Sequence, residues 1–293
     1  MMGEHGKIDI HLHLAPESLS AGNGMKVSGG GEMIPHLEEL GICQGILMSG
    51  GEDGGMMPFG KNDENRELCR KYPERYNWMC NVDERDPETL AERLAEYQRQ
   101  GAVGIGELMI NRRLNHPLLQ KLFAEAEKLQ LPVLFHMSPE EGFGYGVVDE
   151  PGLPLLENVL KTYEKLTVIG HSQPFWHEIS GDAESGREER NAWGKGPVTP
   201  GGRLVELFEK HPNLYGDLSA HSGGCAIMRD PEFGLEFLER FSSRLMFATD
   251  MVNTEMTFPL GAWLDEQAAA GRLSGKAYRA ICFENARRIF GIA

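Results

Sequence analysis

The chain has 293 residues and a formal net charge of −15, with 44 acidic side chains against 29 basic ones. This acidic balance argues against a protein that binds nucleic-acid backbones through a general basic surface. No apolar stretch approaches the ~20 residues that cross a bilayer, the first residues lack the pattern of a secretory signal, and the five cysteines include no CxxC pair. We therefore expect a cytoplasmic protein with free thiols.

Strand-like and helix-like segments alternate along the whole chain. Short β-type runs are expected at residues 8–13, 41–49, 75–82, 102–110, 131–137, 166–171, 213–219 and 244–250, and helices at 87–100, 117–129, 155–165, 203–211, 232–241 and 274–290. This alternation predicts parallel strands joined by right-handed helical crossovers. Eight strands without an internal repeat or linker favour an α/β fold, a single (β/α)8 TIM-barrel domain over residues 1–293.

Three glycine-rich connections, residues 21–31, 49–60 and 173–202, follow strands 1, 2 and 6. They lie at the carboxyl ends of the strands, the face at which barrel active sites are built. None contains the Gly-Lys-Ser/Thr sequence of a phosphate-binding loop. The third is the longest, and its length is typical of a lid or pocket wall. A disordered surface insertion is the alternative.

The first strand ends in His11-Leu12-His13. Side chains alternate between the faces of a strand, so residues 9, 11 and 13 are expected on one face, with Ile8, Ile10 and Leu12 on the other. Two neutral imidazoles that converge on one point are suited to hold a divalent metal. Two hydrogen-bonded histidines without a metal are the alternative.

Four other predicted strands close with a lone polar residue: Glu107, His136, His171 and Asp250. In a barrel these strand ends lie on one rim, so four histidines and two carboxylates would converge on one cavity, enough for two divalent metals. Each residue alone has another explanation: a histidine can bond a backbone carbonyl, Glu107 can pair with Arg112 or Arg113, and Asp250 can cap a helix.

The site residues have these expected roles. The metal ligands are His11, His13, Glu107, His136, His171 and Asp250; the catalytic residues are Asp250 and His171; the substrate contacts are Arg112, Trp176, His177, His221 and Asn253. Asp250 would take a proton from water and pass it to the leaving group. A bound divalent metal would make that water acidic enough to react at neutral pH.

The pattern His11-x-His13, His136, His171 and Asp250 resembles the amidohydrolase superfamily of metal-dependent barrels. Residues 9–16, 244–250 and 284–291 are similar to the amidohydrolase-related branch that includes aminocarboxymuconate-semialdehyde decarboxylase. The resemblance implies a divalent metal as cofactor, with one or two ions. Zinc is the expected metal, and manganese is the alternative. Two features depart from the pattern: strand four has no lysine and carries Glu107, as in TatD-like hydrolases, and Ser172-Gln173-Pro174 follows strand six.

The first hypothesis for function is a metal-dependent hydrolase that uses water to cleave a small-molecule amide, ester or lactone. The alternative is a metal-dependent decarboxylase of a small carboxylic acid, which releases carbon dioxide without consuming water. A TatD-like nuclease and a non-catalytic binding protein are further alternatives. The expected partner is a small-molecule substrate, with neither nucleic acid nor membrane, and a homo-oligomer stays open.

Overall fold

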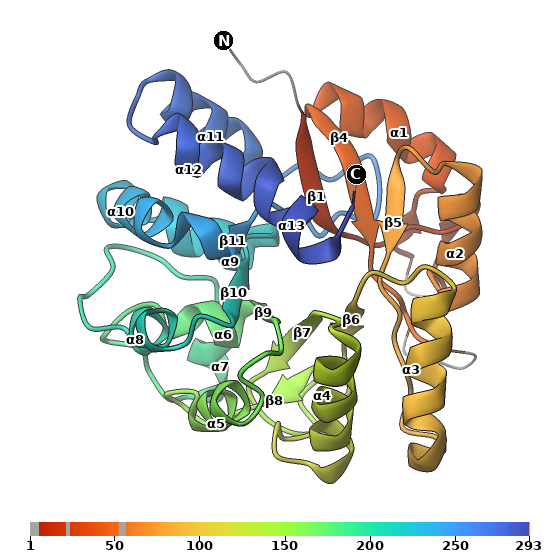
Figure 1. The fold of residues 1–293 in the computed structure, drawn as a ribbon. Coiled ribbons are helices and arrows are strands. Elements are labelled where there is room, and N and C mark those ends of the chain that lie inside the picture. The colour runs from red at the N-terminus through yellow and green to blue at the C-terminus, as the bar shows by residue number, and fades with distance from the viewer. Residues whose placement is uncertain (1–5, 22–23, 53–56, 293) are drawn as a thin grey trace.

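The computed structural model describes residues 6–21, 24–52 and 57–292. Within them, parallel strands surround a common centre, and helices lie outside them (Figure 1). The barrel strands are β1 (Lys7–Leu12), β4 (Ile42–Leu47), β5 (Tyr76–Trp78), β6 (Ile105–Leu108), β7 (Val133–Ser138), β9 (Val168–His171), β10 (Leu214–Asp217) and β11 (Leu245–Met246). They pair in parallel as two sheets, in the orders β1-β4-β5 and β11-β10-β9-β7-β6.

Backbone hydrogen bonds join the two sheets at both of their open edges. The Cys80 N–H donates to the Gly104 carbonyl at 2.9 Å, which links the end of β5 to β6. On the other side, the Ile10 N–H donates to the Phe247 carbonyl at 3.2 Å, and the Asp250 N–H donates to the His11 carbonyl at 2.8 Å. The strands therefore form a closed ring, and the predicted TIM barrel is confirmed.

The helices occupy the predicted crossovers. They are α1 (Gly30–Glu39), α2 (Asn62–Lys71), η1 (Pro87–Thr89), α3 (Leu90–Arg99), α4 (Pro117–Leu129), α5 (Pro154–Thr162), α6 (Gln173–His177), α7 (Arg187–Arg190), α8 (Arg203–Lys210), α9 (Ala220–Met228), α10 (Pro231–Phe241), η2 (Ser242–Arg244), α11 (Leu260–Ala269), α12 (Gly275–Arg279), the π-helical turn η3 (Ala280–Glu284) and α13 (Asn285–Phe290). The short strands are β2 (Leu19–Ser20), β3 (Lys26–Val27) and β8 (Val147–Val148). None of the helices in the described ranges is long and apolar enough to span a membrane.

Two layers of apolar side chains hold the barrel. Ile8 and Ile10 pack with residues from most other strands, such as Ile169, in the inner layer, whereas Leu12 packs with helix residues in the outer layer. The strict alternation predicted for this strand is therefore wrong for Leu12. The physical reason is an irregularity in the pairing of β1 with β4 between Asp9 and Leu12, which shifts the side-chain alternation.

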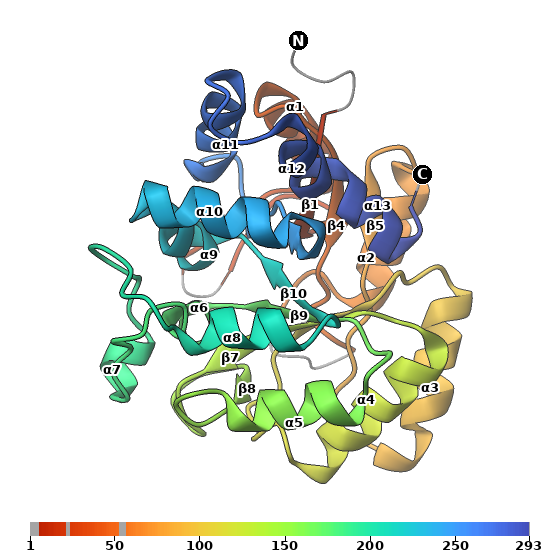
Figure 2. The ribbon, with the colours of Figure 1, turned by 60° about the vertical axis from the view of Figure 1, so that its left-hand side comes forward.

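The two ends of the barrel differ. Ala286, Phe290 and Ile292 pack into the inner layer, so α13 and the second residue after it close one end. Figure 2 shows α13 on one side of the molecule and α7, from the long connection after β9, on the other. The carboxyl ends of the strands face the side away from α13, where the predicted site residues lie.

The long connection after β9 is folded against the barrel. Phe175 is buried and contacts Phe135 edge-on, with ring centroids 6.0 Å apart. The guanidinium of Arg190, in α7, donates to the Pro139 carbonyl at 2.9 Å. This segment is therefore a wall at the carboxyl face and not a disordered insertion.

Candidate active site

The carboxyl ends of the strands bring the six predicted metal ligands into one group, called here the ligand cluster. It consists of His11 on β1, His13 just after it, Glu107 on β6, His136 on β7, His171 on β9 and Asp250 beyond β11. Within the described residues, Glu107 contacts histidines of the cluster and no arginine. Arg112 pairs instead with Glu84, which removes one alternative explanation for Glu107.

Glu107 lies at the centre of the ligand cluster. Its Oε1 is 2.8 Å from His136 Nδ1 and 3.6 Å from His171 Nε2, and its Oε2 is 3.4 Å from His13 Nε2. Burial alone would raise the pKa of Glu107, but His136 and His11 lower it well below its usual value. Glu107 is therefore a carboxylate, which is the form that binds a metal.

His11, His13 and Asp250 converge on a second point. The Nε2 atoms of the two histidines are 3.0 Å apart, and Asp250 Oδ1 lies 3.4 Å from each. The ligand atoms of this triad all lie within 4.8 Å of one another, and so do those of His11, Glu107 and His171. His11 belongs to both triads, whereas His136 belongs to neither.

The donor set of the ligand cluster fits a divalent metal. Imidazole nitrogens with carboxylate oxygens are the ligands that zinc and manganese take in proteins. Burial lowers the pKa of His171 to about 4, so its ring is neutral and keeps a lone pair for an ion. His171 Nδ1 lies 2.9 Å from the Ser219 hydroxyl, so Nε2 is the atom that faces Glu107 and Asp250.

Asp250 connects the ligand cluster to a cleft. Its side chain is 28% exposed, whereas those of His11 and Glu107 are 0% and 4% exposed. Its backbone has a φ of +62°, in the left-handed region that Asp and Asn tolerate better than most residues. The segment after it is irregular, so Asp250 does not cap a helix.

The cleft has a volume of about 500 Å³. It is lined by His136, His171 and Asp250 from the ligand cluster, and by Tyr145, Gln173, Trp193, Ala220, His221, Ser222, Glu255, Met256, Thr257 and Phe258. Tyr145 and Phe258 come from connections after β7 and β11. A small molecule in this cleft would contact Asp250 on one side and aromatic rings on the other.

The sequence model of the amidohydrolase family matches residues 8–292, almost the whole chain. The chain belongs to the amidohydrolase family. This match confirms the superfamily that the strand-end residues predicted. By sequence, no functionally curated protein matches the chain.

Solved structures of this fold include enzymes with two kinds of chemistry. One is a putative 2-pyrone-4,6-dicarboxylic acid hydrolase from Pseudomonas putida (16% identity, TM-score 0.61), aligned over 99% of both chains. Another is 2,6-dihydroxybenzoate decarboxylase from Rhizobium (18% identity, TM-score 0.60), aligned over 98% of this chain and 99% of that one. A dihydroxybenzoic acid decarboxylase from Polaromonas sp. JS666, with bound manganese and the inhibitor 2-nitroresorcinol, aligns over 98% of this chain and 97% of that one (16% identity, TM-score 0.58).

The predicted substrate contacts of this amidohydrolase lie in different places. His221 lines the cleft. Trp176 is buried, and its indole N–H donates to the Asp217 carbonyl at 2.9 Å. His177 lies in a neighbouring cavity, with Nε2 2.8 Å from the Glu184 carbonyl.

Arg112 and Asn253 are absent from the described lining of the cleft. Arg112 pairs with Glu84 at 3.1 Å, and the Asn253 side chain donates to the Lys26 carbonyl at 2.9 Å. Both side chains therefore have structural partners. Arg112 forms a surface ion pair, and Asn253 binds the backbone of the connection that contains β3. A polar residue at the correct face of a barrel can still turn away from the cleft.

Asp217, at the end of β10, was missed by the sequence analysis. Its Oδ2 lies 2.6 Å from His11 Nδ1, and its Oδ1 accepts the Ser219 N–H at 2.7 Å. A carboxylate on the far nitrogen of a metal-binding histidine fixes its tautomer and orientation. The signal that could have found Asp217 is a single acidic residue at the end of an apolar strand. The predicted strand continued to residue 219, so Asp217 did not stand at its end.

Asp217→Asn is expected to weaken divalent metal binding by about 10–100-fold. An amide cannot accept from both His11 Nδ1 and the Ser219 N–H, because one of its two positions is an NH₂ group. His11 would then lose the tautomer that leaves Nε2 free. Competition with a chromophoric zinc chelator measures this loss.

Asp230→Asn is the matched control, because the Asp230 carboxylate likewise uses both oxygens as acceptors, here of the Val198 and Phe233 N–H groups, but lies outside the ligand cluster. It should leave metal affinity unchanged. Equal metal affinity in Asp217→Asn and the parent protein would contradict the orienting role of Asp217.

Proposed function

We propose that this amidohydrolase is a metal-dependent hydrolase that uses water to cleave an ester, lactone or amide bond of a small molecule. The observation that carries the proposal is the position of Asp250, whose Oδ1 is 3.4 Å from both His11 Nε2 and His13 Nε2 while its side chain borders the cleft. A carboxylate in that position can touch both the ligand cluster and a substrate.

The metal would be held by the two overlapping triads, His11 with His13 and Asp250, and His11 with Glu107 and His171. Zinc suits a site rich in imidazole, and manganese, bound in the Polaromonas decarboxylase, is the alternative. Such an ion, when bound, supplies Lewis acidity toward a carbonyl oxygen and makes water more acidic. His11 Nε2 has one lone pair and Nδ1 is held by Asp217, so His11 would bind one ion, and a second ion would need the other ligands of the cluster.

The proton transfers are assigned to Asp250. Burial alone would raise the pKa of Asp250, but His11, His13 and His171 lower it, so the group enters the reaction as a base. It would take the proton of the attacking water and return it to the leaving oxygen or nitrogen. His171, which is neutral, would orient the water and Asp250 from the wall of the cleft.

The charges around the cleft favour hydrolysis of an uncharged substrate. Asp250 and Glu255 line the cleft, and its described lining contains neither lysine nor arginine. An uncharged ester or amide enters this environment without repulsion, and hydrolysis then produces a carboxylate that the same acids help to expel. A substrate for decarboxylation must instead enter as a carboxylate.

Decarboxylation is the second candidate, supported by the similarity to the decarboxylases from Rhizobium and Polaromonas. It requires no change in the ligand cluster, because a metal can hold a substrate carboxylate directly. The two candidates differ in whether water is consumed.

The reaction type can be tested by mass spectrometry in ¹⁸O-labelled water. The metal-loaded protein is incubated with a panel of uncharged esters, lactones and amides and, separately, with aromatic carboxylic acids. Hydrolysis places one ¹⁸O atom in the acid product, and Asp250→Asn should remove this incorporation. Carbon dioxide release from the acids, without hydrolysis of any panel member, would overturn the proposal in favour of decarboxylation.

A further inference from the structure

Aromatic rings line the cleft beside the ligand cluster. The ring of His221 lies between Trp193 and Phe258, with centroid distances of 4.8 Å and 5.2 Å. We call these three residues the aromatic wall. Tyr145 also lines the cleft, 4.3 Å from His136 between ring centroids. Trp193 is 52% exposed and Tyr145 43% exposed, so both rings offer free surface to a ligand.

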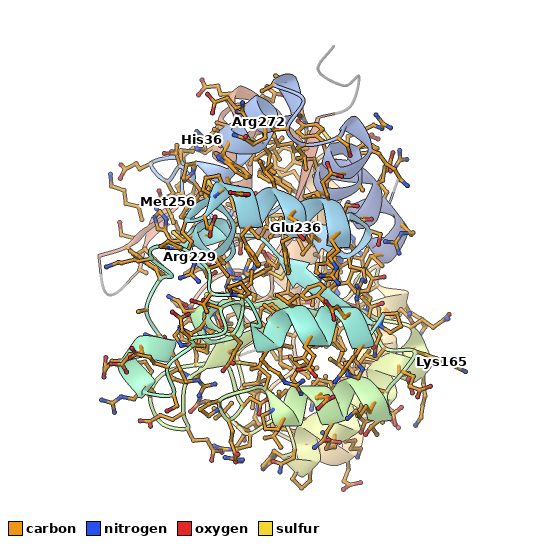
Figure 3. The ribbon with its side chains drawn as sticks, turned by 90° about the vertical axis from the view of Figure 1, so that its left-hand side faces the viewer. His36, Lys165, Arg229, Glu236, Met256 and Arg272 are labelled. Carbon is orange, nitrogen blue, oxygen red and sulfur yellow. The ribbon has the colours of Figure 1, made fainter. Side chains whose placement is uncertain are left out.

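A second cavity of about 440 Å³ adjoins the cleft, and Trp193, Gln173 and Ser222 line both of them. Figure 3 labels one residue of each space, Met256 of the cleft and Arg229 of the second cavity, on the same side of the molecule. The ring of Trp193 therefore lies where the two spaces adjoin. Its size limits how far a bound molecule can extend from Asp250.

Lysine and arginine line the second cavity but are missing from the described lining of the cleft. The cleft has Asp250 and Glu255, and no lysine or arginine among its described lining residues. The second cavity has side chains of both signs, Lys195 and Arg229 together with Asp182, Glu184 and Glu189. Glu255 is itself paired with Lys26, which lies outside the described lining. A negative group carried at the far end of a substrate would therefore find no unpaired lysine or arginine among the described lining residues.

We propose that the cleft selects substrates whose distal part is an uncharged aromatic ring, and that Trp193 is the residue that determines this specificity. The ring would pack on the aromatic wall while the reacting group lies at the ligand cluster. Aromatic contacts of this kind contribute both buried apolar area and favourable ring geometry. The inference rests on the proposed function for the position of the reacting group.

Binding of three hydroxamic acids to the zinc-loaded protein, measured by titration calorimetry, tests the inference without turnover. All three present the same metal-binding group: acetohydroxamic acid has no ring, benzohydroxamic acid has an uncharged ring, and para-carboxybenzohydroxamic acid has a ring with a distal anion. Benzohydroxamic acid is expected to bind about tenfold more tightly than acetohydroxamic acid. The added carboxylate should cost about fivefold or more, because it lies at the aromatic wall, where no lysine or arginine of the described lining compensates its lost hydration.

Trp193→Ala should remove the advantage of the ring, and Trp193→Phe should retain most of it. Trp193 is more than half exposed, so both variants should keep the thermal stability of the parent protein, which a melting curve checks. A ring advantage that persists in Trp193→Ala, or a carboxylated probe that binds as tightly as benzohydroxamic acid, would overturn the inference. Failure of all three probes to bind would instead count against both the metal site and the inference. If only the hydrolysis assay fails, the expected order of probe affinities still tests the inference by itself.

Discussion

Replacement of Asp250 with asparagine is expected to lower kcat by about 10²–10⁴-fold, the usual contribution of a general acid–base group. Asparagine has the same shape and tolerates a φ of +62°, so the backbone and its hydrogen bond to the His11 carbonyl should persist. The amide cannot take a proton from water at neutral pH. The loss should therefore appear in turnover and not in folding.

Steady-state kinetics with the substrate found in the ¹⁸O assay, together with circular dichroism, check this expectation. Asp63→Asn is the matched control, because Asp63 is 78% exposed on α2 and forms only a surface ion pair with Arg66. That variant should keep the parent kcat. Asp250→Asn with more than one tenth of the parent kcat would show that another group moves the proton.

Removal of divalent metal by a chelator is expected to abolish turnover and to lower the free energy of unfolding. An ion that binds only the folded protein stabilises it by about 2.7 kcal/mol when its free concentration is 100 times Kd. The four histidines and two carboxylates of the ligand cluster come from five different strand ends, so the ion would join distant parts of the barrel. Zinc or manganese added back should restore both properties.

Thermal unfolding with and without added metal measures the stabilising effect, and elemental analysis gives the number of ions bound. The control is His13→Gln, which keeps a polar side chain of similar size but lacks the imidazole Nε2 that faces His11 and Asp250. Its melting temperature should respond much less to metal. An unchanged melting temperature and full activity after chelation of the parent protein would contradict a metal centre.

The barrel and the ligand cluster could be predicted because each depends on a simple pattern. Eight apolar runs alternate with helical segments, and several runs end in a single polar residue. A polar side chain at the end of an apolar strand indicates a functional role. Parallel strands place all such ends at one face. His136 and His171 therefore meet Glu107 in the structure, although they are far apart in sequence.

Other features depend on tertiary packing that a single sequence does not reveal. Leu12 lies in the outer layer because β1 is irregular, and the rule of alternation assumes a regular strand. Trp176 and Trp193 occur in the same connection, yet one is buried and the other is half exposed. The direction of each tryptophan ring depends on how the connection after β9 packs against β10 and α9, and not on the residue type.

The contact between Trp176 and Asp217 has a consequence for protein engineering. The indole N–H of Trp176 donates to the backbone carbonyl of Asp217, whose carboxylate contacts His11. A change at Trp176 would therefore reach the ligand cluster through two hydrogen bonds. Trp193 has no such connection among its described contacts, and its ring contacts that of His221. Libraries that seek new substrates for this scaffold should therefore diversify the part of the loop around Trp193 and keep α6 intact.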